Sequence, residues 1–246
     1  MVRDNMRATC TQKQTVIACP VVDDVPGLSA LPADVFGATS HADAPAEVRI
    51  GDSILRLHEG TARPMAFHIY VPDTDATYTR ALQGGFESLQ APVDEDWGER
   101  RANVKDPWGN CWYIATFKGG NYFSDGAPTI QPFLQPVDAA AVIAFPDRAF
   151  GATERGRATS PEGTLLHATL KIGSPSIELI DAIGIYQPMP GICYLSVAHR
   201  EAVYAQAISA GAELVSGPDC LPHTVRDPFG NIWHLEESMP GNSAVN

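Results

Sequence analysis

Residues 105–110 (KDPWGN) recur as residues 226–231 (RDPFGN), 121 positions further along the chain. A second pair of segments, 34–39 (DVFGAT) and 148–153 (RAFGAT), is separated by 114 positions. Both pairs combine Gly with residues that favour turns or helix ends. Because the order of the segments is kept while their separation drifts slightly, the sequence predicts two homologous copies with loop insertions.

Two further blocks support this duplication. Residues 49–51 (RIG) match 171–173 (KIG), and residues 81–87 match 207–213. The stretch between the copies is rich in Gly, Asn, Ser and Pro, which is typical of a linker. We therefore predict one domain at 10–118 and a second at 128–238, joined by a linker at 119–127.

Length and composition restrict the classes of function. The chain has 246 residues, with 29 acidic and 17 basic side chains and a net charge of -12. This charge disfavours binding to nucleic acid or to an anionic membrane, since both require clustered Lys and Arg. We also expect no signal peptide in residues 1–10, which carry charge where an apolar core would be needed. Five cysteines without CxxC spacing predict no disulfide framework, and a reducing cytoplasm fits them.

Each copy has an alternating strand and helix pattern. We expect strands or hairpins at 15–22, 47–58, 66–71 and 101–117, separated by helices at 24–36 and 75–84. Gly37 should end the first helix, Pro32 should kink or shorten it, and Asp75 should cap the second. The second copy repeats this order, with one further short strand expected in each repeat.

These features resemble the vicinal oxygen chelate superfamily, which includes glyoxalase I, bleomycin-resistance proteins and extradiol dioxygenases. The segments 97–100 (WGER) and 130–134 (IQPFL) are similar to its PhnB-like branch. The resemblance implies an α+β fold of tandem domains, each made of two βαβββ modules that form curved sheets around a cavity. It also implies an internal pseudo-dimer that binds a small molecule.

The two aspartates of the repeated turns are interpreted as structural residues. Asp106 and Asp227 each begin a D-P-aromatic-G-N sequence. Asp at the first position of a tight turn accepts backbone N–H groups, Pro fixes the second position, and Gly tolerates a positive φ. We therefore do not assign these carboxylates to catalysis.

The resemblance also indicates where metal ligands would lie. In copy one, these positions fall near Ile17, Arg56, Met65 and Tyr113, none of which is a usual ligand. In copy two they fall on Gln131, Glu178, near Gly191 and on His234. Because this set is incomplete, we predict no metal and no other cofactor, with a divalent metal held by Glu178, His234 and Gln131 as the alternative.

The same positions supply the candidate site residues. We predict acid–base roles for Glu178, His234 and His167, because carboxylates and imidazoles exchange protons near neutral pH. Substrate-binding candidates are polar or aromatic residues expected on cavity-lining strands or pocket walls: Arg56, His68, Tyr113, Gln131 and Trp97. Arg56 could bind an anion or pair with a carboxylate such as Glu59.

Two functions follow from the resemblance. The first is an enzyme of lyase, isomerase or cyclase type that acts on a small molecule without metal. The second is a non-catalytic protein that sequesters a small molecule, as bleomycin-resistance proteins do. Ionisable groups paired in a closed pocket would favour the enzyme, and an open aromatic groove would favour the binder.

Overall fold

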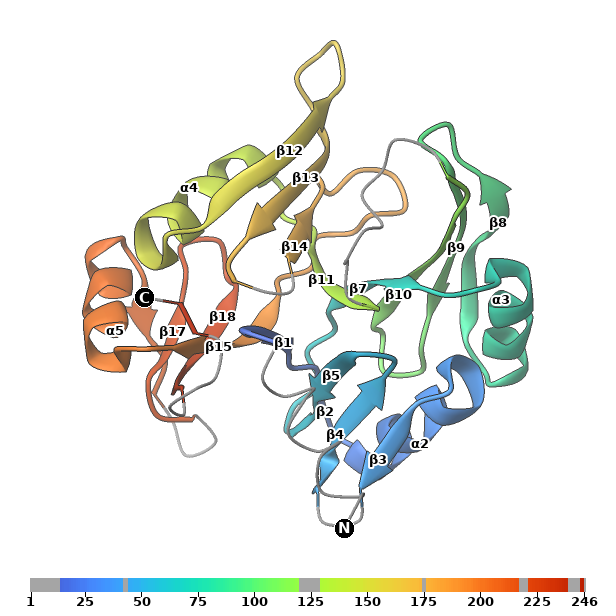
Figure 1. Cartoon of the computed structure of the whole chain (residues 1–246), viewed down its shortest axis with the longest axis horizontal. Coiled ribbons are helices and arrows are strands. Elements are labelled where there is room, and N and C mark those ends of the chain that lie inside the picture. The colour runs from blue at the N-terminus through green and yellow to red at the C-terminus, as the bar shows by residue number, and fades with distance from the viewer. Residues whose placement is uncertain are drawn as a thin grey trace. The chain divides into compact units, whose positions relative to one another are not determined.

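A computed structural model of the chain describes residues 14–41, 44–119, 129–173, 176–216, 221–238 and 244–245 (Figure 1). The chain divides into two compact units. We call residues 19–131 the N-terminal unit. The C-terminal unit combines the first strand of the chain with the residues from Pro132 onward. Each unit is described by itself.

The described elements follow the order βαβββ four times, with two short extra strands. The first module comprises β1 (Val16–Ala18), α2 (Val25–Phe36), β3 (Thr39–His41), β4 (Ala44–Ile50) and β5 (Ser53–Arg56). The second comprises β7 (Ala66–Tyr70), α3 (Thr74–Gln83), β8 (Glu87–Asp94), β9 (Glu99–Lys105) and β10 (Cys111–Phe117). The extra strands are β2 (Val21–Val22) and β6 (His58–Glu59).

The second half of the chain repeats this order. The third module comprises β11 (Ile130–Leu134), α4 (Ala139–Phe150), β12 (Thr153–Thr159), β13 (Leu165–Lys171) and β14 (Ser176–Leu179). The fourth comprises β15 (Ile192–Val197), α5 (Arg200–Ser209), β16 (Glu213–Leu214), β17 (Thr224–Arg226) and β18 (Ile232–Glu237). This α+β arrangement confirms the predicted fold class.

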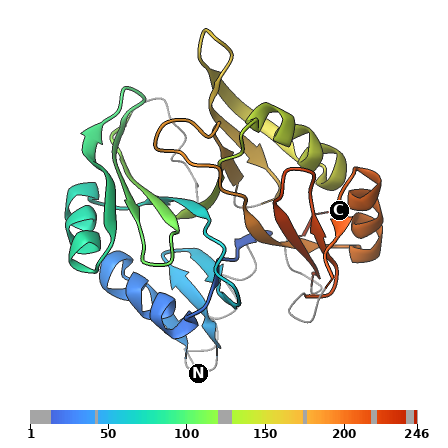
Figure 2. The same ribbon diagram turned by 180° about the vertical axis from the view of Figure 1, so that it is seen from behind.

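In the N-terminal unit, one sheet has the strand order β7-β10-β9-β8. Strands β7 and β10 run parallel, whereas β9 pairs with β10 in antiparallel orientation. A second set of strands has the order β5-β4-β3 and contains the predicted hairpin between Ile50 and Ser53. Helices α2 and α3 pack against each other (Figure 2).

In the C-terminal unit, the strand orders are β12-β13-β14-β11 and β16-β17-β18-β15-β1. The first strand of the chain pairs antiparallel with β15, so that Val16 lies opposite Leu195. Val16 is fully buried in the same apolar core as Leu134 and Phe150. Strand β1, which opens the first sequence copy, therefore belongs to the C-terminal unit. The boundaries of the compact units and those of the sequence copies differ at this strand.

The helices that open the two copies end in the same way. Asp24 caps α2 by accepting the N–H of Gly27, and Asp138 caps α4 in the equivalent manner. Each helix is followed by a glycine in the left-handed region, Gly37 at φ 68° and Gly151 at φ 63°. That conformation is favourable for Gly, which explains why the repeated FGAT segments contain it.

Two details differ from the expectations. The prolines do not shorten the helices, because α2 continues past Pro32 to its predicted end. The N-cap of α3 is Asp73, whose side chain accepts the N–H of Ala76 at 2.9 Å. Asp75 lies in the first turn of α3 and forms two hydrogen bonds of 2.8 Å with Arg100 instead.

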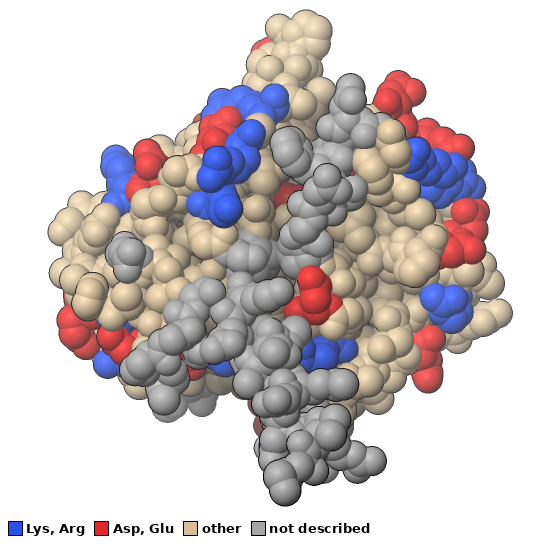
Figure 3. All heavy atoms as spheres, viewed as in Figure 1, with Lys and Arg blue, Asp and Glu red and all other residues tan. Residues whose placement is uncertain are grey.

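On the face shown in Figure 3, Lys and Arg side chains are interspersed with Asp and Glu side chains. Within the described parts of the chain, no helix is both long and apolar enough to cross a membrane.

The thiol of Cys111 is expected to react slowly in the folded protein. Burial, and then the nearby Asp106 carboxylate, raise the pKa of Cys111 to about 11. Because the thiolate is the nucleophile, alkylation at pH 8 should be slow until unfolding exposes the thiol. Iodoacetamide labelling with peptide mass spectrometry, in buffer and in urea, would measure this. Equal labelling of Cys111 in both conditions would contradict it.

Candidate functional site

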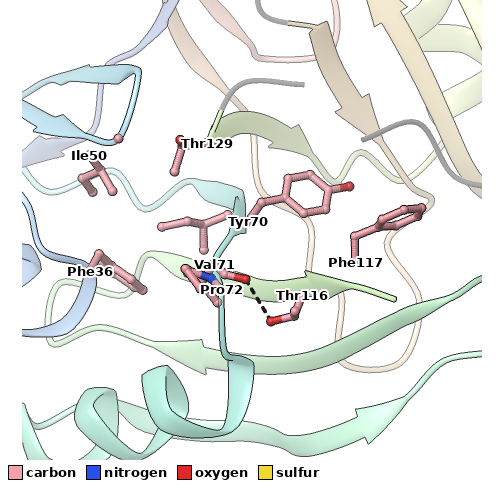
Figure 4. Close-up of a pocket in the computed structure, with 10 residues that line it drawn as sticks. Phe36, Ile50, Tyr70, Val71, Pro72, Thr116, Phe117 and Thr129 are labelled. Atoms are coloured by element: carbon pink, nitrogen blue, oxygen red, sulfur yellow. Dashed lines mark hydrogen bonds between the residues drawn. The ribbon is translucent and has the colours of Figure 1, made fainter. Parts of the chain in front are cut away.

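A cavity of about 670 Å³ lies in the N-terminal unit, where strands β7 and β10 end (Figure 4). Its wall comes from α2, the β4–β5 turn, and the last residues of both strands. The lining residues are mostly apolar or aromatic: Phe36, Ile50, Gly51, Ile69, Tyr70, Val71, Pro72, Thr116, Phe117 and Thr129. This volume falls within the range of small-molecule sites.

A buried carboxylate lies beside this cavity. The Glu99 side chain, at the start of β9, is 1% exposed. Its Oε1 accepts the Tyr70 hydroxyl at 2.9 Å, and its Oε2 accepts the Trp97 indole N–H at 2.9 Å. The His68 Nε2 atom lies 3.9 Å from Oε2. Glu99 is therefore surrounded by three side chains that can donate a hydrogen bond.

Tyr70 connects this carboxylate to the cavity. It is the last residue of β7 and lines the cavity (Figure 4). Its hydroxyl donates to Glu99. The His68 ring packs against the Tyr70 ring, with centroids 4.6 Å apart. Residues two apart on a strand share a face, which explains why His68 and Tyr70 both reach Glu99. We call Glu99, Tyr70, His68 and Trp97 the Glu99 cluster.

Tyr113 lies on the same sheet face as His68. It is fully buried on β10, directly beside His68 in the strand register. The Arg101 guanidinium lies over the Tyr113 ring, with Cζ 5.1 Å from the centroid. The structure thus brings together three residues that the sequence suggested as substrate-binding, Trp97, His68 and Tyr113, on or beside one sheet face.

A second buried carboxylate lies in the C-terminal unit. Glu178 on β14 is 2% exposed, and its Oε2 lies 3.7 Å from the Nε2 of His167 on β13. Its neighbours Ile177 and Leu179 belong to the apolar core. Because side chains alternate along a strand, Glu178 faces away from that core. Two residues predicted as catalytic are therefore adjacent.

His234 is placed differently. It lies on β18, which belongs to another sheet than β14. Its Nδ1 atom is 2.7 Å from the hydroxyl of Thr224, and its ring packs on Tyr194 with centroids 5.0 Å apart. The predicted acid–base roles of His234 and Glu178 stay predictions.

The remaining two candidates, Arg56 and Gln131, lie on strands β5 and β11. Arg56 on β5 pairs with Glu47 of the neighbouring strand, with Nε 3.1 Å from Oε1. The suggested partner Glu59 is not the one seen, because Glu47 is the residue opposite Arg56 in the β4–β5 register. Gln131 lies on β11 and is 4% exposed.

The repeated turns have the structural role that was predicted. Asp106 Oδ1 accepts the backbone N–H groups of Trp108 and Asn110, at 3.0 and 2.9 Å. Its Oδ2 accepts the Asn110 amide and the Trp112 indole N–H. Asp227 makes the same four bonds in the second copy. Burial raises the pKa of both carboxyls, although the N–H donors act in the opposite direction.

Sequence reasoning missed Glu99 and Tyr70 as site residues. A signal was present in residues 99–103 (ERRAN), where Glu, Arg and Asn alternate with other residues on a strand. Alternating polar residues on a strand that is buried on both faces indicate a polar, buried surface. Glu99, Arg101 and Asn103 are at most 7% exposed.

The donor groups present do not form a metal site. Among the side chains that the structure describes, no group of three or more His, Cys, Asp or Glu could hold an ion. Protein metal sites usually have at least three such ligands, whereas Glu99 and His68 supply two.

Comparison with known proteins identifies relatives. A model of the Glyoxalase/Bleomycin resistance protein/Dioxygenase superfamily matches residues 32–114. An uncharacterized protein of Mycobacterium bovis is 32% identical over 134 residues, covering 46% of this chain and 84% of that protein. An uncharacterized protein of Mycobacterium tuberculosis has the same identity over the same length, covering 75% of its own chain.

Solved structures share the fold. Glyoxalase I from Zea mays is 17% identical, with a TM-score of 0.62, covering 89% of this chain and 90% of that chain. A putative dioxygenase from Bacillus subtilis is 13% identical, with a TM-score of 0.57, covering 94% and 86%. The family model thus places residues 32–114 in the Glyoxalase/Bleomycin resistance protein/Dioxygenase superfamily, and the solved structures share the fold of the chain.

Proposed function

We propose that this protein is an enzyme that moves a proton within a small organic molecule, as in isomerisation or elimination. The Glu99 cluster would supply the acid–base groups without a metal ion. The observation that carries the proposal is the buried Glu99 carboxylate, which accepts from Tyr70 and Trp97 beside a cavity. We also infer that the chain arose by tandem duplication and falls in the PhnB-like branch.

The contacts suggest how a proton would travel. Tyr70 both lines the cavity and donates to Glu99. A substrate C–H proton would pass to the Tyr70 oxygen as the Tyr70 proton passes to Glu99. Return along the same path, to another carbon or to a leaving group, restores both side chains. The number of protons on the protein is then unchanged after one turnover.

His68 and Trp97 would position the carboxylate. The Trp97 indole donates to the Glu99 oxygen that Tyr70 does not use, which fixes the orientation of the carboxylate. His68 lies 3.9 Å from that same oxygen. A catalytic group held by neighbours in one orientation reacts faster than a mobile one, because less ordering is required in the transition state.

The C-terminal unit offers a second pair, Glu178 and His167. We place the chemistry in the N-terminal unit for two reasons. The 670 Å³ cavity is lined by residues of that unit, and Glu99 has a hydroxyl partner that lines it. Glu178 and His167 remain the residues to compare in experiments.

Proton abstraction can be measured by deuterium exchange. Wild-type protein in D₂O should accelerate exchange of α-protons in a panel of small ketones and aldehydes, followed by NMR. Tyr70→Phe removes the hydroxyl with little change in shape. It should lower the rate ~10²–10⁴-fold, the usual contribution of one general acid or base, because the proposed proton path runs through this hydroxyl. Exchange at the buffer rate with every compound, despite measurable binding, would favour a sequestering protein instead.

A further inference from the structure

We propose that the cavity of the N-terminal unit binds an uncharged, ring-bearing carbonyl compound, which is the substrate class of the enzyme. This inference rests on the proposed function and specifies its substrate. The charge, aromatic side chains and hydrogen-bonding groups of the cavity wall all favour such a ligand.

The described part of the cavity wall carries no formal charge. Among its described lining residues there is no Asp, Glu, Lys, Arg or His. An ionised ligand there would lose water without gaining an ion-pair partner, which is strongly unfavourable. An anion would in addition be repelled by a chain of net charge -12. The wall therefore selects neutral molecules.

The aromatic side chains of the wall suit a ligand that contains a ring. Phe36, Tyr70 and Phe117 contribute three aromatic rings, and the remaining apolar lining includes Ile50 and Ile69 (Figure 4). The Phe36 ring also packs against Trp112, with centroids 4.8 Å apart. Aromatic rings favour stacked or edge-on contacts with other rings. A ring in the ligand would thus gain contacts that an aliphatic chain of similar size would not.

Few polar groups on this wall can orient a ligand. The Thr116 hydroxyl donates to the carbonyl of Val71 at 2.9 Å and therefore has an internal partner. The Thr129 hydroxyl lies 3.5 Å from the backbone N–H of Asp52, which donates to it. No described residue is seen to accept the Thr129 proton, so this hydroxyl can donate to a carbonyl oxygen of the ligand. A carbonyl also acidifies the neighbouring C–H, which matches the proton transfer proposed at Tyr70.

A matched pair of probes tests the charge requirement. Phenylacetone and phenylacetate have nearly the same shape, but only phenylacetate is charged. Calorimetry or ligand-detected NMR on the full chain should give a dissociation constant at least about tenfold lower for phenylacetone, because of the cost of burying an unpaired anion. Equal or tighter binding of phenylacetate, or no binding of phenylacetone up to its solubility limit, would overturn the inference.

Variants test the location. Phe117→Ala removes one ring of the wall and should raise the dissociation constant of phenylacetone about tenfold, with Phe117→Leu intermediate. Phe229→Ala is the matched control, since Phe229 is 38% exposed on a turn of the C-terminal unit. It should leave binding unchanged. Unaltered affinity in both Phe117 variants would place the ligand elsewhere and overturn the inference.

The two proposals fail in different ways. Binding of phenylacetone in this cavity without α-proton exchange would support the ligand class but reject the enzyme. Exchange of α-protons together with a preference for phenylacetate would support the enzyme and reject the ligand class.

Discussion

Glu99→Gln is expected to lower the rate of α-proton exchange by ~10²–10⁴-fold, which is the usual contribution of one general acid or base. The amide has the size of the carboxylate but cannot take up a proton. It would also turn an NH₂ group toward one of the two donors, Tyr70 or Trp97, which now contact separate oxygens. Exchange rates at saturating ketone, measured by NMR in D₂O, would give this ratio.

Glu178→Gln is the matched control for this variant. Glu178 is buried to the same degree as Glu99 and also has a histidine neighbour, at 3.7 Å. If the chemistry lies in the N-terminal unit, Glu178→Gln should exchange protons at the wild-type rate. The opposite result, a loss in Glu178→Gln and none in Glu99→Gln, would move the reaction to the C-terminal unit. Wild-type rates in both variants would reject acid–base catalysis by either carboxylate.

The fold could be predicted because its determinants are local and repeated. The residues Phe36 and Gly37 end a helix in one copy, and Phe150 and Gly151 do so in the other. Phe36 packs on Trp112, and Phe150 packs on Trp233, with centroids 4.8 and 5.0 Å apart. Such short motifs carry their own turn and packing chemistry, so their repetition indicates a repeated structure.

The site was harder to predict because it depends on which strands are neighbours. Glu178 and His234 were grouped because both occupy expected ligand positions in copy two. The structure places them on different sheets, and His167 is a neighbour of Glu178. Strand order and register are set by contacts distant in sequence, such as the pairing of β1 with β15. A single sequence does not reveal such pairings.

Glu99 illustrates the same limit. Its importance comes from Tyr70, 29 positions away in the chain, and from a cavity formed by α2, β7 and β10. In the sequence, the WGER segment indicates a family resemblance and offers Trp97 as a candidate, but it does not point to Glu99. Alternation along β9 indicates a polar face, but it cannot show that the face meets a tyrosine hydroxyl.

Asp106→Ala is expected to cost about 3–5 kcal/mol of the free energy of unfolding, as for other buried charged networks that lose one partner. The carboxylate is 3% exposed and accepts four N–H groups. Without it, these donors remain buried with no acceptor, and each such donor is costly. The destabilisation would extend to the start of β7. Asp106 holds the side chain of Asn110, and Asn110 in turn accepts the N–H of Met65 just before that strand.

Asp227→Ala provides an internal comparison for this effect. Asp227 makes the same four bonds in the second copy, and Asn231 accepts the N–H of Gly191 before β15. A similar cost is therefore expected, whereas Asp34→Ala, at an exposed position of α2, should change stability by at most about 0.5 kcal/mol. Urea unfolding followed by tryptophan fluorescence would measure all three. If Asp106→Ala and Asp227→Ala unfolded at the same urea concentration as Asp34→Ala, the turn carboxylates would not stabilise the fold. Their recurrence in both copies would then require a functional explanation, because no structural one would remain.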